Sequence, residues 1–197
     1  MKRRIAFFDF DGTITTKDSL LSFIFFRYGK WRTWLGLVMV SPYYAFYILK
    51  LISVQAAKEK VFKQFFKGEK TEEFARACDQ FVKEALPALE RPKALDEIRK
   101  LKDEGAEVVI VSASPENWLI PWSQDFPASV LSTKLETKDG KLTGAIEGFN
   151  CRGKEKVKRI LQSYDLSAYD EIYAYGDTKG DKPMLGLATI SFYKPFR

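Results

Sequence analysis

Histidine is absent from this sequence of 197 residues, although 29% of the residues are charged. Its absence excludes Ser-His-Asp catalytic triads, HExxH zinc sites and phosphatases that form a phosphohistidine. Any chemistry that the protein performs must therefore depend on other side chains.

Cysteine is scarce, since only Cys78 and Cys151 occur. Two cysteines cannot build a disulfide framework or a four-cysteine zinc site. Glu84 and Val157 stand six positions after them, where a cysteine-nucleophile phosphatase loop would need an arginine, so such a loop is excluded as well. We therefore expect two reduced thiols in a cytoplasmic protein.

Long hydrophobic runs are missing too. Asp9 and Asp11 interrupt the N-terminal apolar run before a cleavable signal peptide would be complete, so we expect a buried strand there. The uncharged run 33–49 falls short of the ~20 residues that span a bilayer, and Pro42 interrupts it. We prefer an interfacial hairpin or a pair of helices to a transmembrane helix in this run.

Short apolar segments that end in polar residues predict buried strands at residues 5–10, 107–111 and 172–175. Helical periodicity predicts helices at residues 93–103, 115–124 and 154–164. Ser114 is a candidate N-cap for the second of these helices. The alternation of strands and helices predicts an α/β fold with a doubly wound parallel sheet.

Residues 15–90 break this alternation, because their apolar periodicity is helical and no strand signal occurs among them. We expect a helical cap domain at 15–90, inserted after the first strand into a core domain made of residues 1–14 and 91–197. The dipeptide Asp139-Gly140 lies between two alternating segments and predicts a β-hairpin in the core domain.

The positive charge is concentrated in the predicted cap. The chain carries a net charge of +6, and residues 17–67 contain nine basic residues against two acidic ones. These charges flank the uncharged run 33–49 and are not mixed with stacking aromatics, so we expect no nucleic-acid partner. Two explanations of the run stay equally open, namely peripheral contact with the inner face of a membrane and packing within the cap.

Two carboxylates follow the first predicted strand. Asp9 and Asp11, in the segment DFDGT, can both face the edge of the sheet where open α/β folds bind ligands. Asp9 can act as a nucleophile and metal ligand, and Asp11 can exchange a proton with a leaving group. Gly12 permits the sharp turn after the strand, and Thr13 offers a hydroxyl.

A second acidic loop, GDTKGD, follows the strand predicted at 172–175 and contributes Asp177 and Asp181. Because Asp9 and Asp11 repel each other, a divalent cation is needed unless one of the two carboxylates is protonated, and the second loop would supply the other ligands of the cation. Hard oxygen ligands without histidine or thiolate indicate Mg²⁺.

Three further side chains could contact a phosphoryl group. Ser112 closes the strand predicted at 107–111 and could donate a hydrogen bond to a phosphoryl oxygen. Lys154 and Lys156 open the helix predicted at 154–164 and could neutralise the charge of the phosphoryl group.

The order of DFDGT, VSAS, CRGKEK and GDTKGD resembles the four motifs of the haloacid dehalogenase superfamily of aspartyl phosphatases. The resemblance spans nearly the whole chain. The helical insertion and the KDGKLTGAIEG hairpin look like the branch that includes phosphoserine phosphatase. The resemblance implies a Rossmannoid core with a cap, and Mg²⁺-dependent hydrolysis of a phosphate monoester through an aspartyl-phosphate intermediate.

Carried onto this sequence, the resemblance implies that Asp9 is the nucleophile and Asp11 the general acid and base. Mg²⁺ would be held by Asp9, the backbone carbonyl of Asp11 and Asp177, with Asp181 supporting the site. The phosphate-binding positions implied are Gly12, Thr13, Ser112, Ala113, Lys154 and Lys156.

The catalytic lysine has two candidates. The C-x-G-x-x-K pattern of the branch selects Lys156, which we prefer narrowly, whereas counting back from Asp177 as in phosphoserine phosphatases favours Lys154.

The substrate is less closely determined. Phosphoserine phosphatases usually carry a glutamate nine residues after the nucleophile and a cap arginine, but here Asp18 holds the first position and residues 54–75 contain no arginine. The apolar, basic cap is similar to that of bacterial phosphatidylglycerophosphatases of the same branch, so we expect a lipid phosphate at the membrane surface. A small soluble phosphomonoester is the alternative substrate, and a non-catalytic phospho-acceptor domain is a more remote alternative.

Overall fold

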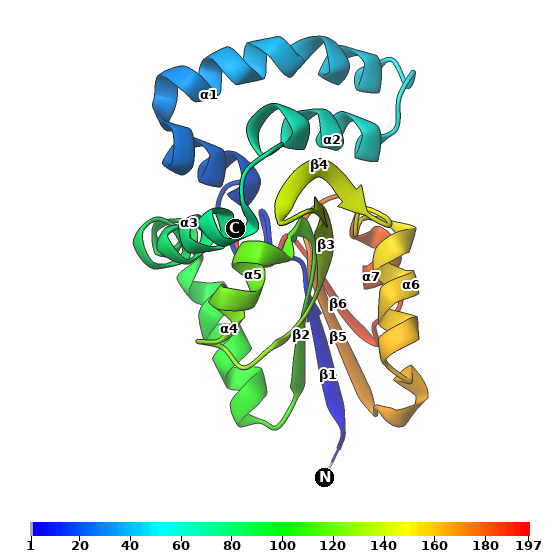
Figure 1. The fold of residues 1–197 in the computed structure, drawn as a ribbon. Coiled ribbons are helices and arrows are strands. Elements are labelled where there is room, and N and C mark those ends of the chain that lie inside the picture. The colour runs from blue at the N-terminus through cyan, green and yellow to red at the C-terminus, as the bar shows by residue number, and fades with distance from the viewer. Residues whose placement is uncertain (1) are drawn as a thin grey trace.

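The computed structural model describes residues 2–197 and contains one six-stranded sheet with helices on both faces (Figure 1). The strand order is β4-β3-β2-β1-β5-β6, and all neighbours are parallel except the pair β3 and β4. This mixed sheet confirms the predicted α/β class and adds β6, which the sequence analysis did not predict. The strands are β1 (Arg4–Phe8), β2 (Glu107–Pro115), β3 (Ser129–Lys138), β4 (Lys141–Glu147), β5 (Glu171–Gly176) and β6 (Ile190–Tyr193).

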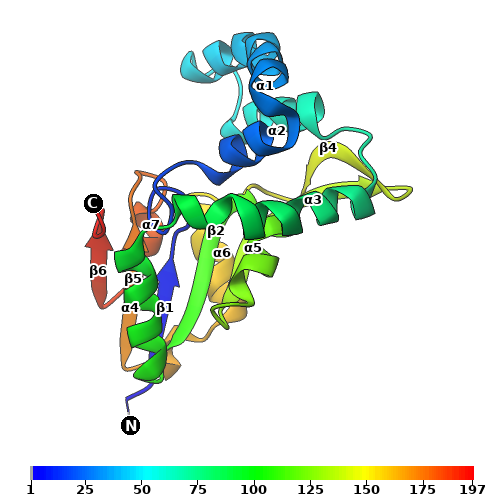
Figure 2. The ribbon, with the colours of Figure 1, turned by 90° about the vertical axis from the view of Figure 1, so that its left-hand side faces the viewer.

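Helices α4 and α5 cover one face of the sheet, and α6 and α7 cover the other (Figure 1). Helices α1, α2 and α3 lie between β1 and β2 in the sequence, and α1 and α2 stand beyond the carboxyl end of β1 (Figure 2). The helices are α1 (Ser19–Ile48), α2 (Val54–Phe65), α3 (Thr71–Glu84), α4 (Pro92–Asp103), α5 (Glu116–Ser123), α6 (Lys154–Ser163) and α7 (Lys182–Leu185), with short 3₁₀ turns η1 (Leu86–Leu89) and η2 (Leu166–Ala168).

The central strand β1 is buried on both sides, which explains why its sequence is continuously apolar. Ala6 and Phe8 point into the core beneath α4 and α5, whereas Ile5 and Phe7 point into the core beneath α6 and α7. Because successive side chains of a strand face opposite ways, one apolar run fills two cores. This packing fixes the end of β1, and therefore the position of the loop that follows it.

The prediction that Ser114 caps a helix is wrong. Strand β2 continues to Pro115 instead of ending at Val111, so Ser114 lies inside the strand, and α5 begins at Glu116 without a side-chain cap. The hydroxyl of Ser114 instead hydrogen bonds to the carboxylate of Asp11.

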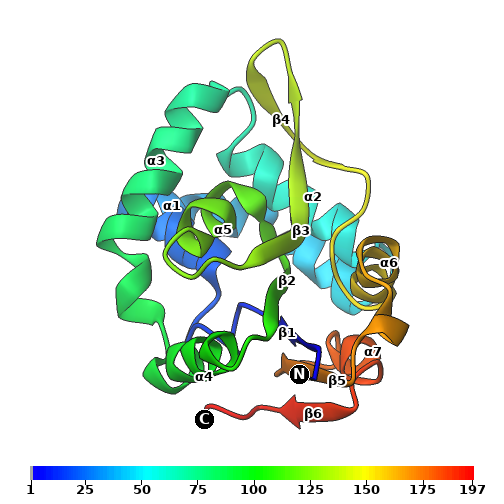
Figure 3. The same ribbon diagram turned by 90° about the horizontal axis from the view of Figure 1, so that it is seen from below.

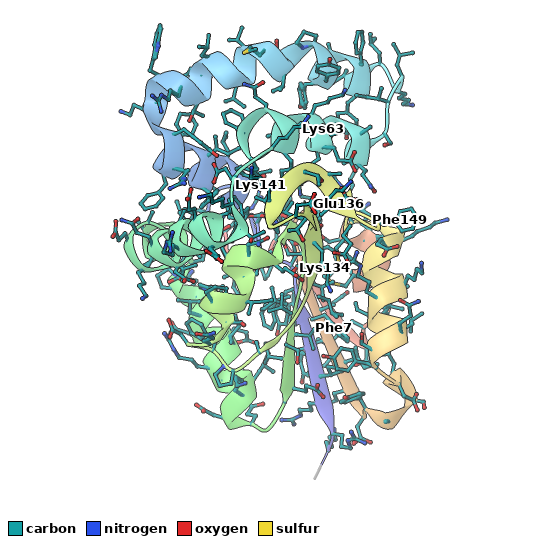
Figure 4. All side chains as sticks on the ribbon, viewed as in Figure 1. Phe7, Lys63, Lys134, Glu136, Lys141 and Phe149 are labelled. Carbon is teal, nitrogen blue, oxygen red and sulfur yellow. The ribbon has the colours of Figure 1, made fainter. Side chains whose placement is uncertain are left out.

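The hairpin predicted at Asp139-Gly140 is confirmed. Both residues have positive φ angles, 52° and 71°, as a two-residue type I′ turn requires. The hairpin reaches the cap, because a Cβ atom on Gly144 of β4 would lie 2.7 Å from Cα of Lys63 in α2. Lys63 is seen above β4 in Figure 4. Only glycine permits this close contact between the hairpin and the backbone of α2.

The inserted helices leave and rejoin the sheet domain at one place. Thr15 and Glu90, the ends of the predicted cap, form an antiparallel bridge with each other. The insertion shares a hydrophobic cluster with the rest of the chain, since Phe23 of α1 stacks on Trp118 of α5 at a centroid distance of 5.1 Å. The division into two domains at these positions stays a prediction.

Helix α1 has a kink at Gly29, and its second half lies beside α2 (Figure 1). Viewed from below, the sheet runs from β6 at one edge to the hairpin of β3 and β4 at the other (Figure 3). Among the helices of residues 2–197, none is both long enough and apolar enough to cross a membrane.

Candidate active site

Asp9 follows β1 directly and is buried at the carboxyl edge of the sheet. Its backbone N–H donates to the carbonyl of Tyr175 in β5 at 2.9 Å, which fixes the loop to the neighbouring strand. One carboxylate oxygen accepts a hydrogen bond from Lys156 Nζ at 2.6 Å, and the other accepts one from Thr13 Oγ1 at 3.3 Å. The carboxylate is therefore held in one orientation by a hydroxyl of its own loop and by an ammonium group from a distant segment.

Lys156 lies in the first turn of α6 and is only 1% exposed. Its ammonium group also donates to Asp181 Oδ1 at 2.7 Å, so it bridges two buried carboxylates. Burial acts to lower the pKa of Lys156, but the charges of Asp9 and Asp181 outweigh this and raise that pKa. The side chain is therefore a fixed positive charge at neutral pH.

Lys154, the other candidate, is exposed and makes no ion pair among residues 2–197. Two residues along a helix correspond to a rotation of roughly 200°, so the two lysines point to opposite sides of α6. Lys156 shares its face with the buried Ile160. The helical spacing of Lys156 and Ile160 was therefore the sequence signal that could have identified Lys156 as the buried lysine.

Asp9, Asp177 and Asp181 form a buried acidic cluster in which one oxygen of each carboxylate lies within 4.8 Å of the others. Burial, the largest effect, raises the pKa of Asp9 to about 7 despite the opposing charge of Lys156. Burial acts to raise the pKa of Asp181 too, but Lys156 and Thr178 outweigh it and lower that pKa. The cluster thus concentrates negative charge that a cation would stabilise.

Asp177 provides the direct evidence that this cluster fits a metal ion. Its Oδ2 accepts a hydrogen bond from Arg197 at 2.6 Å, whereas its buried Oδ1 has no hydrogen-bond partner among residues 2–197. Gly12 has a φ of +80°, and a Cβ atom on it would lie 2.4 Å from Asp177 Oδ2. Only glycine therefore allows the loop after β1 to approach Asp177 so closely. Oxygen donors of this kind suit Mg²⁺.

Asp11 is half-buried and held in place by two groups. The backbone N–H of Ser19 donates to Oδ1 at 2.7 Å, and the hydroxyl of Ser114 hydrogen bonds to Oδ2. Burial and the nearby charge of Asp18 raise the pKa of Asp11 to about 6. The buried hydroxyl of Ser112 accepts a hydrogen bond from the backbone N–H of Ser114 at 3.0 Å.

These groups surround a small cavity of about 100 Å³. Five of the predicted residues border it, and two bordering residues, Arg152 and Thr178, were not predicted. Gly12, Thr13, Ser112 and Asp177 lie outside the cavity wall. The bordering residues are Asp9, Asp11, Ala113, Arg152, Lys156, Thr178 and Asp181.

The sequence analysis missed several residues of the site for a common reason. Ser19 and Arg197 reach Asp11 and Asp177 from positions that are remote in the chain, so no local signal marks them. Arg152 stands inside the segment CRGKEK and could have been considered with the two lysines.

A second, larger cavity of about 380 Å³ lies between α1 and α2, and we call it the cap groove. Its walls are mostly apolar, and Arg152 borders both this groove and the small cavity. The residues that border the groove are Leu37, Val40, Ser41, Tyr44, Tyr47, Val54, Ala57, Lys58, Val61 and Arg152.

Two curated proteins are similar to this chain over most of its length. It is 35% identical to the CicA protein of Caulobacter vibrioides, over 96% of this chain and 85% of that protein. It is 29% identical to a protein of Mycobacterium tuberculosis described as a probable phosphatase, over 93% of this chain and 66% of that protein.

Solved structures and family models agree with this similarity. A substrate-bound phosphoserine phosphatase has the same fold, with a TM-score of 0.66 and 18% identity over 98% of this chain and 86% of that chain. The model of the haloacid dehalogenase-like hydrolases matches residues 6–186. That match includes the end of β1 and the loops that carry the acidic cluster. The chain therefore belongs to the family of haloacid dehalogenase-like hydrolases.

Proposed function

We propose that this protein is a Mg²⁺-dependent phosphatase that hydrolyses a phosphate monoester through a phosphorylated Asp9. The observation that carries the proposal is the buried Asp9 carboxylate, held 2.6 Å from the Lys156 ammonium in a cavity that Asp11 also borders. The similarity to a probable phosphatase and the fold shared with a phosphoserine phosphatase support it.

The reaction proceeds in two displacements. A carboxylate oxygen of Asp9 bonds to phosphorus, the bond between phosphorus and the ester oxygen breaks, and Asp11 donates its proton to the leaving alcohol. Asp11 then takes a proton from water, whose oxygen bonds to phosphorus while the bond to Asp9 breaks and phosphate is released. Lys156 stabilises the negative charge on the phosphoryl oxygens throughout.

Asp9, Asp177 and the backbone carbonyl of Asp11 would hold Mg²⁺, and Asp181 would support the site through Lys156. When bound, the ion supplies positive charge that offsets the repulsion between the carboxylates and the phosphoryl group. Thr178 donates two hydrogen bonds to Asp181 Oδ2, at 2.9 Å from its backbone N–H and 2.7 Å from its hydroxyl, and so keeps Asp181 turned toward Lys156.

The substrate that the cap groove favours is a lipid phosphate, such as phosphatidylglycerophosphate. The groove is apolar, has a volume of about 380 Å³ and shares Arg152 with the small cavity. A phosphate placed beside Asp9 can therefore be joined to an apolar chain that lies between α1 and α2. Burial of that chain would supply binding energy at roughly 25 cal/mol per Å² of apolar surface.

The outer face of α1 is suited to an anionic membrane surface. Trp31, Leu35 and Val38 follow a helical spacing, and Trp31 is 81% exposed. The basic residues Lys30 and Arg32 lie next to this apolar stripe and are exposed. Apolar side chains flanked by cations are typical of helices that bind at the interface of anionic membranes. This surface would bring the enzyme to a lipid substrate.

A small soluble phosphomonoester is the alternative substrate, because the small cavity can hold a phosphate whether or not the groove is filled. In that case the groove residues only pack the cap. A higher kcat/KM for O-phosphoserine than for a short-chain lipid phosphate would favour this alternative.

The first prediction concerns the nucleophile. Asp9→Asn should lower the turnover of p-nitrophenyl phosphate at least about 10³-fold, because an amide cannot attack phosphorus as a carboxylate does. Asp139→Asn is the matched control, since it makes the same change in an exposed turn that also accepts asparagine. Retention of more than about a tenth of the turnover in folded Asp9→Asn would contradict the proposal.

The second prediction separates the two lysines. Lys156→Ala should lower kcat about 10²-fold or more, with a smaller change in KM, because the positive charge acts mainly in the transition state. Lys154→Ala should retain kcat within about two-fold, since Lys154 lies outside the site. Circular dichroism checks the fold of both variants, and a reversed pattern would show that Lys154 is the catalytic lysine.

The third prediction tests metal binding without measuring activity. Saturating Mg²⁺ should raise the melting temperature of the wild-type protein by about 5 °C or more, because an ion that binds only the folded state stabilises it. Asp177→Asn should lose most of this shift, whereas Asp139→Asn should keep it. An equal shift in both variants would place the ion away from Asp177.

The fourth prediction concerns the membrane. The wild-type protein should sediment with phosphatidylglycerol vesicles at low salt and much less at about 1 M salt, where screening is strong. The double variant Trp31→Ser with Val38→Ser should lose this binding, and Phe149→Ser, which removes an exposed aromatic from the segment between β4 and α6, should retain it. Sedimentation of the double variant at the wild-type level would contradict the assignment of this face.

A further inference from the structure

Two basic side chains lie where the cap groove meets the small cavity. Arg152 borders both spaces, and Lys58 borders the groove. The ammonium of Lys58 donates to the carbonyl of Ala113 at 2.6 Å, and Ala113 itself borders the small cavity. The two cations therefore occupy the junction between the site of the reaction and the apolar groove.

Neither cation has an acidic partner. Among residues 2–197, no carboxylate oxygen lies within 4.0 Å of Lys58 Nζ or of the guanidinium of Arg152. By contrast, Arg159, in the same helix as Lys156, is paired with Glu155 at 3.0 Å. Burial, the largest effect, lowers the pKa of Lys58, the carboxylates of Asp18 and Asp11 raise it, and Arg152 lowers it further. Arg152 is thus close enough to Lys58 for their charges to interact unfavourably.

The carboxylates of Asp18 and Asp11 offset that repulsion at Lys58 without forming a salt bridge to it, so the donors of both side chains stay available to a small anion placed between them. Arginine presents a planar set of donors that matches an oxyanion, and lysine adds a point charge. The carboxylates of Asp9 and Asp181 do not play this part, because both are paired with Lys156 and neither forms a salt bridge with Lys58 or Arg152.

We propose that Lys58 and Arg152 form a subsite for a second anionic group of the substrate, a phosphodiester or a carboxylate, between the reacting phosphate and the apolar groove. This inference rests on the proposed phosphatase function and narrows its substrate class. The substrate then carries, in order, a phosphate monoester, a short polar linker with one anion, and an apolar chain. The small cavity takes the monoester, because its volume of about 100 Å³ cannot admit the rest.

The test compares substrates with and without the second anion, and the variants show whether Lys58 and Arg152 account for the difference. Dioctanoyl phosphatidylglycerophosphate has an internal phosphodiester that dioctanoyl phosphatidic acid lacks, and O-phosphoserine has a carboxylate that O-phosphoethanolamine lacks. For each pair, kcat/KM for the substrate with the second anion is divided by kcat/KM for the substrate without it. This ratio is measured with Mg²⁺ in the wild-type protein and in variants. We expect Arg152→Ala and Lys58→Met to lower the ratio in the lipid pair at least about ten-fold, because a charge-assisted contact is lost only with the doubly anionic substrate.

Two controls make the comparison specific. Lys67→Ala removes an equal charge from an exposed position of the cap and should leave the ratio unchanged. Arg152→Lys keeps the charge without the planar donors and should restore part of the ratio.

The outcomes separate the subsite from the phosphatase function. If Arg152→Ala and Lys58→Met lower the ratio in the soluble pair alone, the bound anion is a carboxylate and not a phosphodiester. That result would support the subsite. An equal loss with both members of each pair would overturn it, because the residues would then act on the reacting phosphate or on folding. Failure of the wild-type protein to hydrolyse any of the four substrates would overturn the proposed function and the subsite with it.

Discussion

The candidate site depends on one buried ion pair, in which the ammonium of Lys156 lies between the carboxylates of Asp9 and Asp181. Transferring charged groups from water into a protein interior is costly, and this cost is offset only when each charge has well-placed partners. The arrangement meets this condition, because Thr13 also binds Asp9 and Thr178 also binds Asp181. The ion pair thereby connects the loops that follow β1 and β5 to the first turn of α6.

The sheet brings these groups together. β1 pairs with β5 in parallel, so the loops that follow both strands emerge at the same edge and place Asp9 beside Asp177. The close approach of Gly12 to Asp177 completes the acidic cluster. Within the described part of the chain, Oδ1 of Asp177 has no hydrogen-bond partner, and a bound cation would satisfy it.

The inserted helices form an apolar groove that shares a bordering residue with the site. Phe23 connects α1 to Trp118 of the sheet domain, and the hairpin at Gly144 supports α2 from below. These contacts hold the cap groove next to the small cavity, with Arg152 between them.

The sequence by itself determined the class of fold, the hairpin and the segments that carry the acidic residues, because each of these signals lies within a few neighbouring residues. Alternating apolar residues, an Asp-Gly turn and carboxylates directly after a strand are properties of the local chain. Only the tertiary structure decided which lysine enters the site, since Lys154 and Lys156 differ in the face of α6 on which they lie and in what packs against that face. The same holds for Ser114, which binds Asp11 instead of capping a helix, and for Arg152, which borders two cavities. Their surroundings are built from segments far apart in the sequence, and no local pattern encodes such contacts.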